Sequence, residues 1–140
     1  MNKINFGRVL LGGIVAGLIL NIGEVLLNDI ILGPHIEADM KRMNITPPGG
    51  GFAVLAVTLT FVVGILAVAL YALIRARLGP GPKTALVTAL ILWFCVYAYS
   101  GTVNMLLINV PPKLILMILA WGIVEYPLGI LAGAALYKES

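Results

Sequence analysis

The hydrophobic positions of the chain fall into four long apolar runs that are separated by short polar stretches. The runs cover residues 6–32, 51–74, 84–110 and 114–137, and no charged residue occurs between Arg42 and Arg75 or between Lys83 and Lys113. A helix needs about 20 apolar residues to cross a hydrocarbon layer of ~30 Å, so each run is long enough to span a membrane. The pattern predicts an all-α integral membrane bundle of four transmembrane helices, in a single domain over residues 1–140.

The polar stretch at residues 33–50 is the longest connection, and its pattern predicts a short helix. Pro34 suits a first helical position. Ile36, Met40 and Met43 recur at i, i+4 and i+7, which gives this helix one apolar face that could lie along the outer membrane surface. Turns are expected at residues 47–51, 79–82 and 111–112, where proline and glycine gather.

Composition supports the membrane interpretation and narrows the partners. The chain is 61% hydrophobic and 11% charged, whereas ordinary soluble domains are roughly 45 to 50% apolar and about 25% charged. The formal charge of +3 is modest, and most basic residues lie near the ends of apolar runs. We therefore expect lipid headgroups of the bilayer as their partners, and no nucleic acid. The lone Cys95 lies inside an apolar run and is expected to behave as a small hydrophobic residue.

The distribution of Lys and Arg predicts the orientation of the bundle. Positive residues are retained on the cytoplasmic side, and six of the nine basic residues would share the side that holds both termini. We therefore expect cytoplasmic N- and C-termini. Lys3 and Arg8 before an apolar run could mimic a secretory signal, but no small-residue cleavage pattern follows, so a retained first helix is expected.

Two acids lie inside the predicted spans, Glu24 in the first and Glu125 in the fourth. A central charge in a membrane helix costs about 2.5 to 3.5 kcal/mol on insertion scales, so each should face protein or trapped water. Residues of the first helix that share a stripe with Glu24 are small toward the termini and polar toward the other side. They are Gly13, Gly17, Asn21 and Asn28.

The fourth helix repeats this arrangement in the opposite direction, with Trp121, Glu125, Gly129 and Gly133 each four residues apart. Small residues four apart let helix backbones approach closely. If Gly13 and Gly17 meet Gly129 and Gly133 in an antiparallel pair, the depths of the two acids differ by only about 4 to 5 Å at ~1.5 Å per residue. The two carboxylates could then share one proton.

The third helix adds further polar groups that could complete a pocket. Tyr97, Ser100 and Asn104 are expected on one face, with Trp93 one turn away. These residues, together with Asn21, Asn28 and Trp121, are candidates for a proton or solute site. Two alternatives stay open: the amides and hydroxyls could simply link helices, and a protonated Glu24 or Glu125 could do the same.

We expect a non-enzymatic protein, either an accessory subunit of a larger membrane complex or a homo-oligomer held together by its tight helix seams. The alternative is a proton- or cation-coupled transporter of a small solute that uses Glu24 and Glu125. An enzyme, a cofactor or a metal centre is not expected. His35 stands alone in a loop, and the sequence shows no cysteine motif and no nucleophile paired with a base.

In its four short helices and its membrane-embedded glutamate in the first helix, the chain resembles the small multidrug-resistance transporters. The likeness is limited to Glu24 and to aromatic residues such as Trp93 and Tyr97. The chain departs from that pattern by its second acid, Glu125, by the long loop at residues 33–50 and by its stronger charge bias. The resemblance implies a transport role for Glu24.

Overall fold

The computed structural model describes residues 3–139, and its regular elements there are all helical. Four of its helical stretches are long and apolar enough to cross a membrane: Phe6–Ile31, Gly50–Leu78, Pro82–Leu107 and Pro112–Leu136. The first comprises α1 (Phe6–Val25) and the π-helical η1 (Leu26–Ile31), and the second is α3 (Gly50–Leu78). The third comprises α4 (Pro82–Trp93), the π-helical η2 (Phe94–Gly101) and α5 (Thr102–Leu107), and the fourth is α6 (Pro112–Leu136). The four-helix prediction is confirmed.

The helix boundaries differ from the apolar runs because helices do not end where hydrophobicity ends. α3 continues to Leu78 and includes Arg75 and Arg77, whose positive charges favour the C-terminal end of a helix. Gly79, with φ of 82°, then ends it. α4 and α6 begin at Pro82 and Pro112, earlier than expected, since proline fits the first turn of a helix.

The short helix predicted between the first two spans is also present, as α2 (Gly33–Arg42). It ends near Asn44, whose positive φ of 55° is one that asparagine tolerates. The guanidinium of Arg42 pairs with Asp39 at 3.0 Å and donates to the carbonyl of Ile108, also at 3.0 Å. Arg42 therefore ties α2 to the end of the third span.

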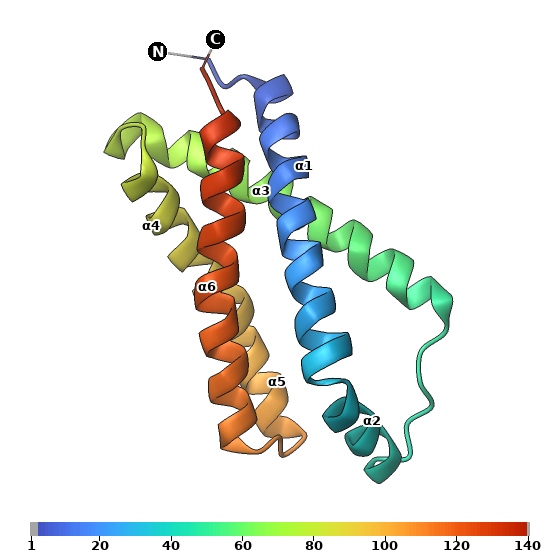
Figure 1. Ribbon diagram of the computed structural model, residues 1–140. Coiled ribbons are helices and arrows are strands. Elements are labelled where there is room, and N and C mark those ends of the chain that lie inside the picture. The colour runs from blue at the N-terminus through green and yellow to red at the C-terminus, as the bar shows by residue number, and fades with distance from the viewer. Residues whose placement is uncertain (1–2, 140) are drawn as a thin grey trace.

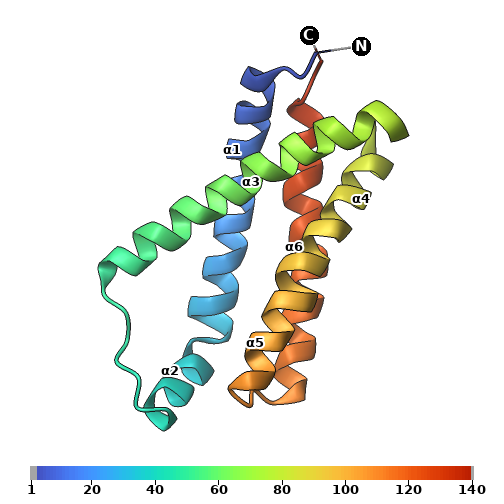
Figure 2. The ribbon, with the colours of Figure 1, turned by 180° about the vertical axis from the view of Figure 1, so that it is seen from behind.

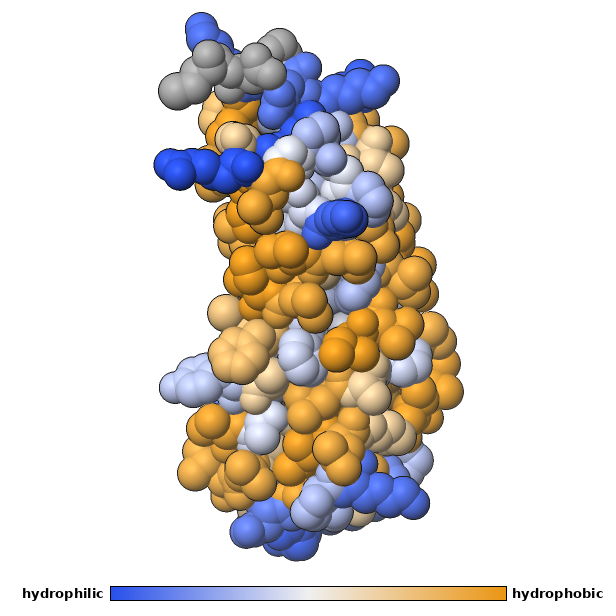
Figure 3. Space-filling model, turned by 90° about the vertical axis from the view of Figure 1, so that its left-hand side faces the viewer, coloured by the Kyte–Doolittle hydropathy of each residue, from blue (hydrophilic) through white to orange (hydrophobic). Residues whose placement is uncertain are grey.

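The surface carries a broad apolar region between two polar ends (Figure 3). Large hydrophobic side chains are exposed on all four long helical stretches, including Leu18, Leu55, Phe94 and Leu128 at 52%, 57%, 58% and 57%. Water would not tolerate this much contiguous apolar surface, whereas lipid does. The chain is therefore a multi-pass membrane protein.

α1 lies at the centre of the bundle, between α3 and α6 (Figures 1 and 2). Its contacts there are so close that a methyl group on Gly64 of α3 would strike the backbone of Gly13 and Gly17. On its other side, a methyl group on Gly133 of α6 would meet the carbonyl oxygen of Gly12 at 2.6 Å. Small residues thus form two separate seams along α1.

These seams correct the predicted pairing of the glycine patches. Gly13 and Gly17 face Ile65 and Phe61 of α3, while Gly129 and Gly133 face a second strip of α1, at Gly12, Ala16 and Leu20. The prediction that Gly13 and Gly17 meet Gly129 and Gly133 is therefore wrong, although all four glycines lie at helix contacts. The reason is that α1 has small residues on two faces, and the four-residue spacing alone does not say which face meets which neighbour.

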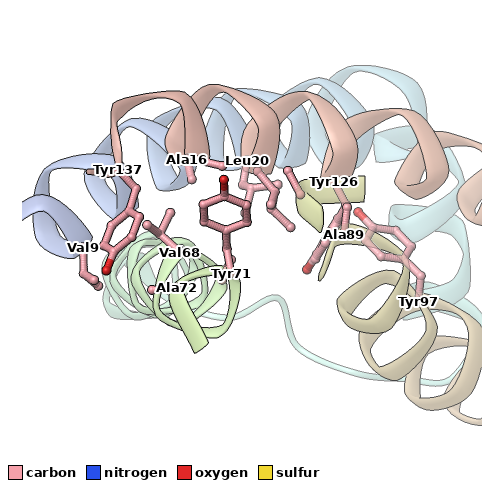
Figure 4. Packing of buried hydrophobic residues seen from close by; sticks show 14 of the residues in the cluster. Val9, Ala16, Leu20, Val68, Tyr71, Ala72, Ala89, Tyr97, Tyr126 and Tyr137 are labelled. Atoms are coloured by element: carbon pink, nitrogen blue, oxygen red, sulfur yellow. The ribbon is translucent and has the colours of Figure 1, made fainter. Parts of the chain in front are cut away.

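The end of the bundle that holds both termini is closed by aromatic packing (Figure 1). The rings of Tyr71 and Tyr137 meet edge to face at 6.1 Å, and the guanidinium of Arg75 lies 5.8 and 5.2 Å from their centroids. Arg75 also pairs with Glu139 at 3.1 Å. Figure 4 shows Tyr71 and Tyr137 with Val9 and Ala72, well separated along the bundle from Tyr97 and Tyr126.

At the opposite end the helices spread apart. α3 crosses the bundle at a steep angle, so its N-terminal half leaves α1 and extends to one side, with α2 between their ends (Figures 1 and 2). Residues 50–55 of α3 are all exposed. This separation leaves space beside the polar part of α1.

Candidate functional site: a carboxyl–tyrosine–carboxyl triad

The two intramembrane acids are joined by one tyrosine hydroxyl. The Tyr97 oxygen, from η2, lies 2.8 Å from Oε1 of Glu24 on α1 and 2.8 Å from Oε2 of Glu125 on α6. Glu125 is buried, with 4% of its surface exposed, whereas Glu24 is half-buried. We call these three residues the triad. They bring together three of the four membrane-spanning stretches.

The two short contacts require more hydrogens than the tyrosine alone supplies. A phenol carries one hydrogen and can donate it to one oxygen only, while an ionised carboxylate only accepts. The second 2.8 Å contact therefore needs a hydrogen on one of the carboxyl groups. This geometry fits the expectation that Glu24 and Glu125 share one proton between them.

Two glycines make room for the triad. A methyl group on Gly23 of α1 would meet Cδ of Glu125 at 2.6 Å, and one on Gly122 of α6 would meet Cγ of the Tyr97 ring at 2.7 Å. Tyr126 packs edge to face on Tyr97, with 5.5 Å between centroids and 84° between planes. Sequence reasoning missed these three residues, because Gly23, Gly122 and Tyr126 lie outside the four-residue stripes that singled out the acids.

Of the two asparagines in the first span, one bonds to the triad and the other does not. Asn28 donates from Nδ2 to Oε2 of Glu24 at 2.7 Å and to the carbonyl oxygen of Glu24 at 3.0 Å. Asn21 donates to the carbonyl oxygens of Gly17 at 2.8 Å and Val57 at 3.4 Å. Asn28 is thus part of the site, while Asn21 links α1 to α3.

The polar residues predicted on the third span are only partly brought together. Asn104 lines a cavity together with Tyr97 and Glu24, although its amide bonds to the carbonyl of Ser100 at 2.7 Å rather than to an acid. Ser100 is exposed and lines neither of the two cavities described below. The expectation that it shares a face with Tyr97 assumed α-helical spacing. Residues 94–101 form a π-helix, whose i→i+5 bonds make each turn longer, so residues three or four apart no longer align.

The indole nitrogens of the two tryptophans differ in their hydrogen bonding. Trp93 donates its indole hydrogen to the carbonyl of Leu119 at 3.0 Å and so fixes the third span to α6. Trp121 lies one turn before Glu125, and its buried indole nitrogen and Oε1 of Glu125 both lack a hydrogen bond. Trp121 is therefore a neighbour of the triad, with an unused donor close to an unused acceptor.

Two cavities meet at Glu24 and Asn28, which line both. The cavity on the α5 side, of about 490 Å³, is largely apolar and also borders Tyr97; we call it the α5 cavity. The cavity on the α3 side, of about 950 Å³, lies in the space that α3 leaves beside α1; we call it the α3 cavity. The apolar face of α2, with Ile36 and Met40, lines both cavities. The position of this face along the membrane surface stays a prediction.

Apart from His35, the ionisable side chains that line these cavities are acids and Tyr97. Acids line them at Glu24, Asp29, Glu37 and Asp39, and no Lys or Arg does. All the lining residues belong to the half of the bundle near α2, since none comes from residues 3–20, 61–95 or 119–139. Within residues 3–139, no group of three His, Cys, Asp or Glu is placed to hold a metal ion.

α6 is continuous through Pro127, which lies two residues after Glu125. Proline leaves the carbonyl of residue i−4 without its usual donor, and here that is the carbonyl of Ile123. The helix is held straight by contacts on both sides, since Gly129 and Gly133 pack on α1, while Gly122 packs on the Tyr97 ring.

Comparisons with known proteins provide no guide to this site: the chain matches no protein family, no curated protein and no solved structure. The resemblance to the small multidrug-resistance transporters gains no support from them. The functional interpretation therefore depends on the residues of the chain itself.

Proposed function

We propose that this chain is a membrane carrier of a small cation, and that it couples the movement of the cation to a proton held in the triad. One observation carries the proposal: Glu24 lines both cavities and is linked through Tyr97 to a second, buried carboxyl group. Intramembrane acids in such positions are characteristic of ion and proton pathways. A purely structural acid would not need to border two cavities.

The preference for a cation follows from charge. Of the four acids that line the cavities, Glu37 and Asp39 are paired with Lys41 and Arg42, so the net negative charge comes from Glu24 and Asp29. Because no basic side chain lines the cavities, they favour positive over negative solutes. Inside the apolar part of the bundle this effect is strong, because the surroundings screen charge poorly. The ionised form of Glu24 would then be the direct ligand of the cation.

Coupling follows from the number of charges that the triad tolerates. Two ionised carboxylates on one hydroxyl would repel each other and leave one 2.8 Å contact without a hydrogen, so one proton and one open carboxylate suit the site. A cation that leaves Glu24 makes room for a proton there, and the reverse exchange returns it. In this proposal, the cavities near α2 and the close packing near the termini belong to one side of an alternating-access cycle.

The test uses the purified chain in sealed lipid vesicles that contain a pH-sensitive dye. Putrescine, choline and tetramethylammonium serve as cationic probes, and acetate and succinate as anionic ones. At least one cation should drive a proton flux that Glu24→Gln and Glu125→Gln abolish, while Asp29→Asn, which changes an exposed acid at the rim, keeps most of it. Cation-driven flux that persists in both glutamine variants would refute the proposal.

We also propose the orientation that charge predicts, with both termini in the cytoplasm. Both termini and the α3–α4 turn lie at one end of the bundle (Figure 1), and Lys3, Arg8, Arg75, Arg77, Lys83 and Lys138 belong to these segments. The cavities would then open toward the outside. Single cysteines at Lys83 and Lys113, in a Cys95→Ala background, test this with a membrane-impermeant thiol reagent on intact cells: only the one at Lys113 should react.

The alternative is a protein of assembly, either a homo-oligomer or an accessory subunit of a larger complex. The N-terminal part of α3 favours it, because Phe52, Val54 and Leu55 are 61%, 69% and 57% exposed on a helix that leaves the bundle. A partner helix could cover this part of α3. Gentle extraction followed by mass measurement of the detergent-solubilised particle decides: a monomer with cation-driven flux supports the carrier, and a stable complex without flux supports assembly.

A further inference from the structure

The hydrogen bonds of Glu24 show which member of the triad suits a negative charge. Its Oε2 accepts the Asn28 amide at 2.7 Å, and its Oε1 faces the Tyr97 hydroxyl at 2.8 Å. The orientation of the Asn28 amide is fixed, because the same nitrogen reaches the main-chain carbonyl of Glu24, which can only accept. Both carboxyl oxygens of Glu24 therefore have a donor, and Glu24 also borders the two cavities.

Glu125 has the opposite surroundings. It is 4% exposed; its Oε2 lies 2.8 Å from the Tyr97 hydroxyl, and its Oε1 lies beside the Trp121 indole without a hydrogen bond of ordinary geometry. A buried carboxylate that no positive charge faces is costly, while a neutral carboxylic acid is not. The other groups that face it bring no positive charge: the indole of Trp121, the rings of Tyr97 and Tyr126, and the backbone at Gly23.

With a single proton on the two acids, only one arrangement gives every short contact a hydrogen and leaves no buried charge. Glu125 donates its carboxylic hydrogen to the Tyr97 oxygen, Tyr97 donates to Oε1 of Glu24, and Asn28 donates to Oε2 of Glu24. A proton on Oε2 of Glu24 would confront the Asn28 donor. A proton on Oε1 of Glu24 would leave Glu125 ionised with its Oε1 unsatisfied.

We propose that the extra proton of the triad rests on Glu125, and that Asn28 is the positioning residue that keeps it there by stabilising the charge of Glu24. This deepens the proposed function. It separates the open carboxylate that meets the cation from the buried acid that stores the proton. With no cation bound, the proton rests on Glu125. For exchange, Tyr97 can pass its hydrogen to Glu24 and take that of Glu125, so only O–H bonds form and break, the tyrosine is neutral before and after, and the negative charge moves transiently from Glu24 to Glu125.

Infrared difference spectroscopy of the full chain in lipid bilayers at neutral pH tests this without any solute. The wild-type protein should show the C=O stretching band of one protonated carboxylic acid. Glu125→Gln should remove that band, and Glu24→Gln should keep it. The proposal is overturned if the wild-type band is absent, or if it depends on Glu24 and not on Glu125.

The role of Asn28 has its own test in the same spectra. Asn28→Leu should move part of the intensity into a second, Glu24-dependent band, because Glu24 loses its donor and competes for the proton. Asn28→Gln, which keeps an amide donor, should restore the single band. Asn21→Leu is the matched control and should leave it unchanged, since Asn21 bonds to main-chain carbonyls only.

Helical circular dichroism and a monodisperse particle show that each variant is folded. In a folded Asn28→Leu protein, a single unchanged band would refute the positioning role. The infrared band tests the position of the proton and does not require transport. A protein that transports no cation can still show the Glu125 band, and a protein that transports a cation can lack it, so failure of this proposal is distinguishable from failure of the proposed transport function.

Discussion

Gly23→Ala should break one side of the triad while leaving the fold intact. The new methyl group would meet Cδ of Glu125 at 2.6 Å, whereas ordinary contacts begin at 3.4 Å, so the carboxyl group must retreat by about 0.8 Å (3.4 − 2.6). If it moves directly away from Tyr97, the 2.8 Å contact lengthens to about 3.6 Å, which is beyond hydrogen-bond range.

The stability change should be small because two effects oppose each other. Loss of a hydrogen bond costs about 0.5 to 1.5 kcal/mol, while alanine favours a helix over glycine by about 0.8 to 1.0 kcal/mol. The methyl group strikes the end of a flexible side chain rather than a backbone, so the helices need not separate. The thermal midpoint should therefore remain close to that of the wild type.

The assay is the ¹³C resonance of Tyr97 Cζ in bilayers, which responds to hydrogen bonds of the phenol oxygen. In Gly23→Ala it should move toward its position in Glu125→Ala. Gly51→Ala is the control, because a methyl group there meets nothing within 4 Å, and it should leave the resonance unchanged. An unchanged Tyr97 resonance in Gly23→Ala would show that Glu125 does not lie against Gly23.

Three further predictions concern the rest of the molecule. Gly64→Ala should lower the free energy of unfolding by about 1 to 3 kcal/mol relative to Gly51→Ala, because its methyl group strikes the α1 backbone; equal unfolding curves in detergent would contradict the seam. The hydrogen bond and charge of Lys41 lower the pKa of Glu37 below its ordinary 4.5. The pair should therefore stabilise α2 at pH values above 4.5, and this stabilisation should be lost as the pH falls through the lowered pKa. The NMR titration midpoint of Glu37 should rise in Lys41→Met, and an unchanged midpoint would count against the pair. Arg42→Ala should speed hydrogen exchange in α2 by freeing it from Ile108, whereas Lys41→Ala should do so less, and equal rates would show that Arg42 does not anchor α2.

The fold was predictable because a membrane-spanning helix requires a long apolar run, which is easily recognised in a sequence. Spans of about 20 apolar residues, prolines at the turns and the amphipathic pattern of residues 33–42 identified the four membrane spans and α2. The glycine seams were harder, since α1 has small residues on two faces. Only the three-dimensional packing shows that Gly64, which lies outside any stripe, is the residue against Gly13 and Gly17.

The site was predictable in its acids and less so in its surroundings. The cost of charge in lipid singled out Glu24 and Glu125, and the stripe rule found Asn28. The same rule failed for Ser100, because residues 94–101 are π-helical and no sequence signal marked the change of period, whereas Asn104 does line a cavity with Tyr97. Gly23 and Gly122 were missed because their role is to leave space, which is visible only once Glu125 and Tyr97 occupy it.

The most direct test of the account is whether one tyrosine joins both acids in a real bilayer. Solid-state NMR of the wild-type chain, with ¹³C labels at Tyr97 Cζ and at the carboxyl carbons of glutamate, measures this. The account predicts short-range cross-peaks from Tyr97 to two glutamate carboxyl carbons, one lost in Glu24→Gln and the other in Glu125→Gln. A single cross-peak, or none, would contradict the triad.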